Sequence, residues 1–221
     1  MPRRLLFAIP LLGGCATMGT FQNAETLGKG KWEVGIEPSM WGAASESATV
    51  MYPHAGVSAR VGLSDRIDVG GRVGSSGIEL SGKFGLTDRE SNVPVSIAPS
   101  VGGLALGAGS TSFSIIALQV PVLVGLRMGE NEVVLGPKVH LWSFGASVDN
   151  SGASAAIWSL GASAGYSARV GPTVRLIPEL AVLRPIVVTG ATDTTSDTVG
   201  VDSAGVLLQV GLGIVIGSPA E

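Results

Sequence analysis

The chain has 221 residues with 14 basic and 17 acidic side chains, which give a formal net charge of −3. Charged residues make up only 14% of it, against about 25% in a typical water-soluble domain, and glycine is unusually frequent at 33 residues. This charge balance argues against a nucleic-acid-binding protein, which needs a clustered basic face. A single cysteine leaves no disulfide within the chain, so the fold must be held by other means.

The first fifteen residues read MPRRLLFAIPLLGGC. Two arginines, a short apolar run and then small residues are typical of a secretory signal peptide. The apolar run from Leu5 to Leu12 is too short to cross a bilayer, which takes about twenty residues. The sequence therefore predicts a removable signal peptide over residues 1–14.

The end of this leader, Leu12-Gly13-Gly14-Cys15, resembles the lipobox of bacterial lipoproteins. The resemblance implies cleavage before Cys15 and a covalent diacylglycerol and N-acyl chain on that cysteine, with no other cofactor. Ala16 stands where an aspartate often marks inner-membrane retention, so the resemblance also implies sorting to the outer membrane of a Gram-negative bacterium. Without Arg3 and Arg4 the mature chain keeps 12 basic and 17 acidic residues, a net charge of about −5.

Apolar and polar residues alternate with period two along most of the mature chain, which indicates strands. Val57, Val61 and Leu63 alternate with Arg60 and glycine or serine, and the same pattern recurs to the end of the chain. Ten candidate strands start near Lys31, His54, Arg66, Gly77, Pro94, Ser112, Glu132, Ala155, Val174 and Ala204. No apolar stretch of eighteen residues follows Cys15, so a membrane helix is excluded, whereas a closed barrel can still cross a bilayer.

The sequence thus predicts an all-β fold: an antiparallel, up-and-down transmembrane β-barrel of about ten strands over residues 31–217. A flexible lipidated linker over residues 15–30 is expected before it and a short tail over residues 218–221 after it. Short turns such as Ser64-Asp65-Arg66 alternate with often longer Ser-, Thr-, Gly- and Ala-rich loops such as residues 190–203. Outer-membrane barrels have short periplasmic turns and longer external loops. This orientation places Cys15 on the periplasmic side.

Aromatic residues provide a second indication of a barrel, because outer-membrane barrels carry aromatic girdles at both membrane interfaces. Eight aromatic residues fall near predicted strand ends: Trp41, Tyr52, Phe113, Trp142, Phe144 and Trp158 at outer ends, and Trp32 and Phe84 at inner ends. Trp142 and Phe144, however, alternate in step with Lys138 and His140, so they should point into the barrel like those two residues.

Four prolines lie inside predicted strands, where each removes a ladder hydrogen bond: Pro99, Pro121, Pro137 and Pro178. They keep open a second interpretation, a lipid-tethered soluble barrel or sandwich that binds a small ligand. In that case the apolar face of each strand would point inward.

If the apolar face meets lipid, the opposite face lines a lumen that ten strands widen only modestly beyond a filled interior. We expect a network of opposed charges to plug this lumen, formed by Glu33, Glu37, Arg60, Asp68, Arg72, Glu79, Lys83, Arg127, Lys138, His140, Arg169, Arg175 and Glu179. With Arg66 included, bases outnumber acids eight to five, which keeps a narrow anion-leaning pore as an alternative.

Chemical motifs are weak. Two histidines and one cysteine form no metal cluster of useful spacing, and His54 has no acid placed convincingly beside it. The acidic segment with Asp193, Asp197 and Asp202 could bind calcium, but a solvated loop is expected. The sequence predicts a non-enzymatic outer-membrane protein with a structural or surface-interaction role, whose partners are membrane lipid and lipopolysaccharide. It gives no oligomeric state.

Overall fold

The structure, a computed structural model, describes residues 17–44, 49–75, 77–149, 151–192, 196–200 and 205–218. The predicted signal peptide, Cys15, the three acids of the 190–203 segment and the end of the tail therefore have no described side chains. All regular structure in the described part is β-strand. Within these residues no helix is long and apolar enough to cross a membrane.

Fourteen strands make up the described fold. Their bounds are β1 Trp32–Ile36, β2 Ser39–Ala44, β3 Thr49–His54, β4 Gly56–Ser64, β5 Ile67–Gly74, β6 Gly77–Gly85, β7 Val95–Ile97, β8 Ser100–Ala108, β9 Thr111–Met128, β10 Asn131–Val148, β11 Ser151–Arg169, β12 Val174–Thr192, β13 Ser196–Gly200 and β14 Val206–Gly217.

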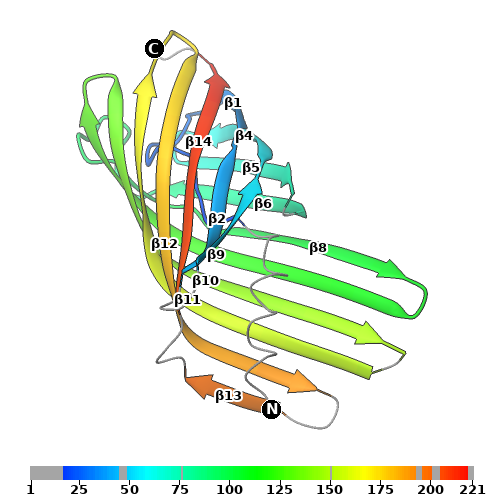
Figure 1. Cartoon of the computed structure of the whole chain (residues 1–221). Coiled ribbons are helices and arrows are strands. Elements are labelled where there is room, and N and C mark those ends of the chain that lie inside the picture. Colours follow the sequence, from blue (N-terminus) through cyan, green and yellow to red (C-terminus); the bar gives the residue numbers. More distant parts are fainter. Residues whose placement is uncertain are drawn as a thin grey trace.

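The strands close into one antiparallel barrel (Figure 1). β14 pairs on one side with β12 and on the other with β1 and β2, so the last part of the chain meets the first. β1 with β2, β3 with β4, β7 with β8 and β13 with β14 each share one position, so the strands fill ten positions around the barrel. The fold class and the strand number are therefore as predicted.

Prolines mark several of the breaks and irregularities in the strands. Pro38 lies between β1 and β2, and Pro99 lies between β7 and β8. Pro121 and Pro178 stay in register, opposite Lys138 and Leu212 respectively. Beside Pro185 the register of β11 and β12 shifts between Trp158 and Ser159, as a β-bulge does. Of the four prolines predicted inside strands, Pro99 therefore falls in a break, whereas Pro121, Pro178 and also Pro137, opposite Ala162, lie within paired strands.

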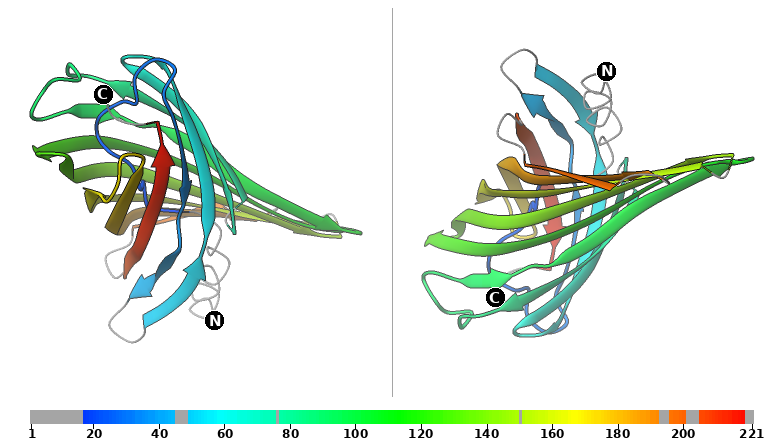
Figure 2. Two further views of the ribbon diagram at one scale, coloured as in Figure 1. Left: turned by 90° about the horizontal axis from the view of Figure 1, so that it is seen from above. Right: turned by 90° about the horizontal axis from the view of Figure 1, so that it is seen from below.

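The two ends of the barrel differ. We call the end that carries the tight turns, such as Asp65-Arg66 and Gly129-Glu130, the turn end, and the opposite end the loop end. From β8 to β12 the strands run far beyond the loop end and leave the barrel as a flat sheet (Figures 1 and 2). Much of what the sequence suggested as Ser-, Thr-, Gly- and Ala-rich loops is therefore strand. In the predicted loop over residues 190–203, for example, β12 extends to Thr192 and β13 covers Ser196–Gly200.

Large apolar side chains cover the outside of the barrel. Leu80 is 64% exposed, and Val57, Ile116, Val210 and Ile216 also point outward. Charged side chains of the same strands are enclosed, as Lys83 shows at 2% exposure. The strands therefore present the apolar half of their two-residue repeat outward, as predicted.

The aromatic residues divide between the two faces. Trp32, Phe84 and Trp158 are exposed on the outside, as predicted for girdle residues. The prediction is wrong for Trp41, Trp142, Phe144, Tyr52 and Phe113. The first three form a buried cluster inside the barrel with Met18, Ile115, Ala181 and Leu183, and the other two pack against it. These rings line the lumen towards the loop end, where Met18 of the N-terminal segment packs among them.

Candidate functional site

The N-terminal segment, residues 17–28, lies inside the barrel. Thr17, Met18, Thr20, Phe21 and Ala24 are almost fully buried. The flexible linker predicted over residues 15–30 is therefore, in this part, a segment packed in the lumen. The segment has no regular secondary structure, so its main-chain polar groups need partners other than a ladder.

At its first residues the segment is held by side chains of β14 and β12. The Gln209 side-chain oxygen accepts hydrogen bonds from the main-chain N–H groups of Met18 at 2.6 Å and Gly19 at 2.8 Å. The Glu179 carboxylate accepts from the N–H groups of Thr20 at 2.7 Å and Phe21 at 2.6 Å, and from the Thr20 hydroxyl at 2.9 Å. These two wall residues thus satisfy four consecutive N–H groups.

Nearer the turn end, two further carboxylates take over this role. Ala24 N–H donates to Glu132 at 2.8 Å, and Leu27 N–H donates to both oxygens of Asp68 at 3.1 Å. Because the inward carboxylates meet N–H donors, they gain partners that the wall itself does not supply.

The carbonyl groups of the segment receive hydrogen bonds from wall cations. Lys138 Nζ donates to Met18 O at 2.5 Å, and Lys83 Nζ donates to Asn23 O at 3.1 Å and Glu25 O at 2.7 Å. Arg72 donates to Thr20 O at 3.4 Å. Most contacts between wall and segment therefore reach main-chain atoms of the segment.

Phe21 is the main exception, because its side chain occupies a slot in the wall. A Cβ atom on Gly211 would lie 2.7 Å from the Phe21 ring, and one on Gly213 would lie 3.1 Å from Phe21 Cβ. The glycines on the inward face of β14 therefore make room for this ring. Phe21 also has a left-handed φ of 47°, which is unusual for a bulky residue and fits a tightly held position.

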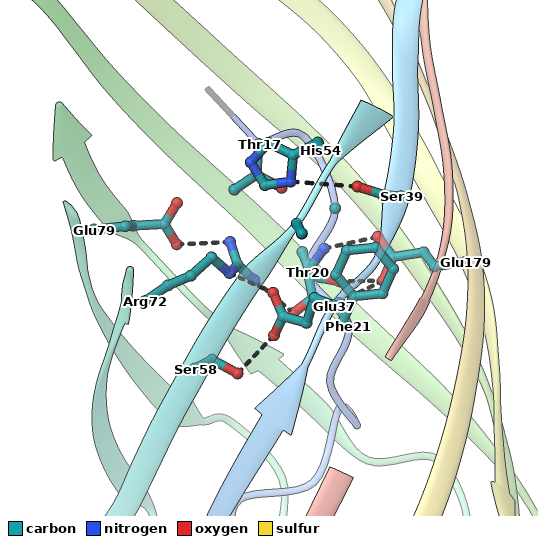
Figure 3. A network of polar contacts seen from close by, with 12 residues as sticks. Thr17, Thr20, Phe21, Glu37, Ser39, His54, Ser58, Arg72, Glu79 and Glu179 are labelled. Carbon is teal, nitrogen blue, oxygen red and sulfur yellow. Dashed lines mark hydrogen bonds and ion pairs between the residues drawn. The ribbon is translucent and has the colours of Figure 1, made fainter. Parts of the chain in front are cut away.

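A second set of charges connects neighbouring wall strands (Figure 3). Arg72 lies between two carboxylates, with its Nε 2.5 Å from Glu37 and a terminal nitrogen 3.1 Å from Glu79. Ser58 donates to Glu37 at 2.6 Å. Elsewhere in the lumen, Arg60 pairs with Glu33 and also contacts Gln22 of the segment. Lys83 lies 3.4 Å from Asp68.

The predicted lumen residues at the turn end lie at its rim. Arg127 pairs with Glu25 at 2.8 Å, and Arg175 donates to the Ser167 hydroxyl at 3.4 Å. Arg169 is half-buried, and its main-chain N–H donates to Asn131 at 2.9 Å. Arg66 does not belong to the lumen, because it forms an exposed pair with Asp88.

The two histidines are both buried. Among the described residues, His140 has no hydrogen-bond partner for either ring nitrogen, so its predicted place in a hydrogen-bonded network is wrong. Its ring instead packs edge-on against Trp142, with centroids 4.2 Å apart. His54 lies beside Ser39, whose hydroxyl is 3.4 Å from His54 Nδ1 (Figure 3).

The structure brings the predicted charges together but changes their balance. Of the eight proposed bases seven remain, because Arg66 lies outside. The acids rise from five to seven, because Glu132 faces inward and Glu25 enters with the segment. Arg89 joins the bases, because it pairs with Glu25 at 3.4 Å and donates to Leu27 O at 3.2 Å. Among the described residues eight bases therefore meet seven acids, and the predicted excess of three bases falls to one. Glu132 and Gln209 were missed as site residues, although each follows the inward parity of its strand.

The N-terminal segment leaves little open space among these groups. The cavity bordered by Thr20, Gln22, Arg60 and Arg72 measures about 20 Å³. This is room for about one water molecule. The site is thus a barrel lumen that binds its own N-terminal segment.

Replacing Glu179 with alanine should destabilise the barrel by about 3 kcal/mol, because three donors of the segment lose a charged acceptor in an enclosed site. Unfolding by urea in lipid vesicles, followed by tryptophan fluorescence, measures this loss. Glu130→Ala is the matched control, because Glu130 is exposed in a turn, and it should change stability by less than about 0.5 kcal/mol. Equal stability of the two variants would contradict the role given to Glu179.

The sequence matches no protein-family model, and no curated protein is similar to it. Among solved structures, the chain is similar to the attachment invasion locus protein Ail of Yersinia pestis, in complex with the heparin analogue sucrose octasulfate. The identity is 10%, the alignment covers 85% of this chain and 99% of that one, and the TM-score is 0.47. Neisserial surface protein A is 14% identical, with 85% of this chain and 99% of that one covered and a TM-score of 0.42. The outer membrane protease OmpT of Escherichia coli is 12% identical, with 91% of this chain and 98% of that one covered and a TM-score of 0.37. At this level the similarity concerns the course of the strands and not function.

Proposed function

We propose that this chain is an outer-membrane β-barrel lipoprotein of a Gram-negative bacterium, with a non-enzymatic structural or surface-interaction role. Its barrel spans the membrane, Cys15 carries the lipid, and the N-terminal segment closes the lumen. The single observation that carries the proposal is the inverted distribution of side chains: the exterior is apolar and the interior is charged.

This distribution supports a membrane rather than water around the barrel. Ile78 and Leu80 are more than 60% exposed, whereas Asp68 and Lys83 are at most 2% exposed. In water each such aliphatic side chain would forgo about 1.5–3 kcal/mol of burial energy, and a continuous apolar band would promote aggregation. Lipid removes this cost. The same observation argues against the tethered soluble binder, which needs its apolar side chains inside.

Protein extracted from membranes in mild detergent should migrate faster on a gel when unboiled than when boiled, because a closed barrel of ten positions resists the denaturing detergent until it is heated. Electrophoresis of paired boiled and unboiled samples measures this shift. Identical migration of the two samples would reject the membrane barrel.

The occupied lumen favours a closed barrel over a conducting pore. The wall charges are largely taken up by the segment or by one another, and the cavity beside Arg60 and Arg72 holds about 20 Å³. A selective pore needs a continuous water path and an excess of one charge on its wall. The described lumen has eight bases and seven acids, so it offers almost no such excess.

The wild-type protein should therefore be silent in a planar bilayer, whereas deletion of residues 17–28 should produce discrete current steps because it removes the segment from the lumen. The double variant Glu179→Ala/Gln209→Ala, which removes the main acceptors for the start of the segment, should show brief openings. Each variant is first checked for the gel shift of a folded barrel. Steady conductance by the wild type would instead support the pore, and silence of the folded deletion variant would contradict closure by the segment.

The lipid anchor on Cys15 is part of the proposal and derives from the lipobox resemblance. Labelled palmitate should enter the wild-type protein and be absent from Cys15→Ala, while Ala16→Ser should retain the label because the cysteine is intact. Autoradiography of the immunoprecipitated proteins measures incorporation. An unlabelled wild type would remove the anchor from the proposal and leave the barrel.

The long hairpins support a role at the cell surface. A strand crosses a membrane in about 9–11 residues, but β9 and β10 have 18 residues each and β11 and β12 have 19. At about 3.3 Å a residue, some 25 Å of each strand extends beyond the bilayer. The protruding part of β8 and β9 carries no charged side chain. We therefore expect the acyl chains of lipopolysaccharide to contact the apolar outside of the barrel within the membrane, and partners to contact the uncharged sheet that protrudes above it.

A further inference from the structure

The direction in which the N-terminal segment crosses the barrel follows from its contacts. Met18 contacts Gln209, which lies eight residues from the turn-end terminus of β14, and Thr20 contacts Glu179, five residues from the turn-end terminus of β12. Ala24 and Leu27 contact Glu132 and Asp68, each one residue from its strand terminus. The chain therefore descends from Thr17 to Gly28 towards the turn end.

The height of Thr17 above the turn end decides which membrane interface Cys15 can reach. Eight residues of a strand tilted by about 40° rise about 20 Å, and the apolar band of an outer-membrane barrel is about 25 Å tall. Cys15 is two residues before Thr17, a reach of about 7 Å. As long as Gln209 holds the segment, Cys15 can reach the outer interface of the membrane but not the inner one.

The rim of the barrel is not equally high all the way round. β5 ends at Gly74, seven residues above its start, so the hairpin between β5 and β6 ends at about the level of Gln209. The tall sheet begins with β8, the neighbour of β6. Val73 and Ile78 on the outside of the β5–β6 hairpin are strongly exposed, so at this part of the rim the apolar exterior begins at about the level of Gln209.

We propose that the N-terminal segment leaves the barrel at its loop end, so that the lipid on Cys15 inserts into the outer leaflet of the membrane. The inference rests on the membrane placement and the acylation proposed above. It reverses the sequence-based expectation of a periplasmic anchor, because that expectation assumed a flexible linker before the first strand.

Labelling of single introduced cysteines on intact cells tests the route. Ala16→Cys, with Cys15 retained and wild type as the background, should react with a membrane-impermeant biotin maleimide without permeabilisation. Ser110→Cys, exposed in a loop-end hairpin, should react in the same way. Lys29→Cys, exposed at the turn end, should react only after the outer membrane is opened. Every variant must show the gel shift of a folded barrel.

Reaction of Ala16→Cys only after permeabilisation, in the manner of Lys29→Cys, would overturn the route. A peptide epitope inserted between Ala16 and Thr17 provides a second measurement, because an antibody should bind it on intact cells and should bind the same epitope after Ser218 only in opened cells. Failure of Ser110→Cys to label intact cells would reject the proposed membrane placement. Labelling of Ala16→Cys without palmitate in the wild type would reject the outer-leaflet lipid alone.

Discussion

The structure depends on one constraint: charges enclosed by the barrel must find partners inside it. Four wall side chains that accept main-chain N–H groups are Gln209, Glu179, Glu132 and Asp68, and they follow the segment from one level of the lumen to the next. Lysines and an arginine do the same for its carbonyl groups. An ionised group left alone in such an interior would cost several kcal/mol, so segment and wall stabilise each other.

This mutual dependence explains why the lumen is not simply a network of wall charges. The Arg72 cluster with Glu37 and Glu79 does pair wall with wall. Glu179 and Lys138, however, reach the segment, where they meet a donor and an acceptor on adjoining peptide groups. Without the segment, Glu179 and Lys138 would lose these partners and would face water in a wider lumen.

Much of the fold could be predicted from the sequence, because a strand with one apolar, outward-facing side must repeat every two residues. The alternation of Val57, Val61 and Leu63 around Arg60 identified both faces of β4, and the enclosed positions of Arg72 and Lys83 follow from the same rule. The N-terminal segment could not be predicted in this way. It has no period, and its contacts use main-chain atoms that every sequence possesses. The prediction for the aromatic residues was wrong for another reason. Trp142 and Phe144 occupy inward-facing positions of their strand, but their place near its outer end suggested the membrane interface.

Because the wall binds the segment largely through its peptide groups, the polar partners on the wall are tied to a fixed backbone. Shape adds a second constraint, since Phe21 fills the slot beside Gly211 and Gly213 and Met18 packs in the buried aromatic cluster. Over evolutionary time the stretch that occupies the lumen should therefore change in step with the wall, and a substitution on one side calls for a matching one on the other.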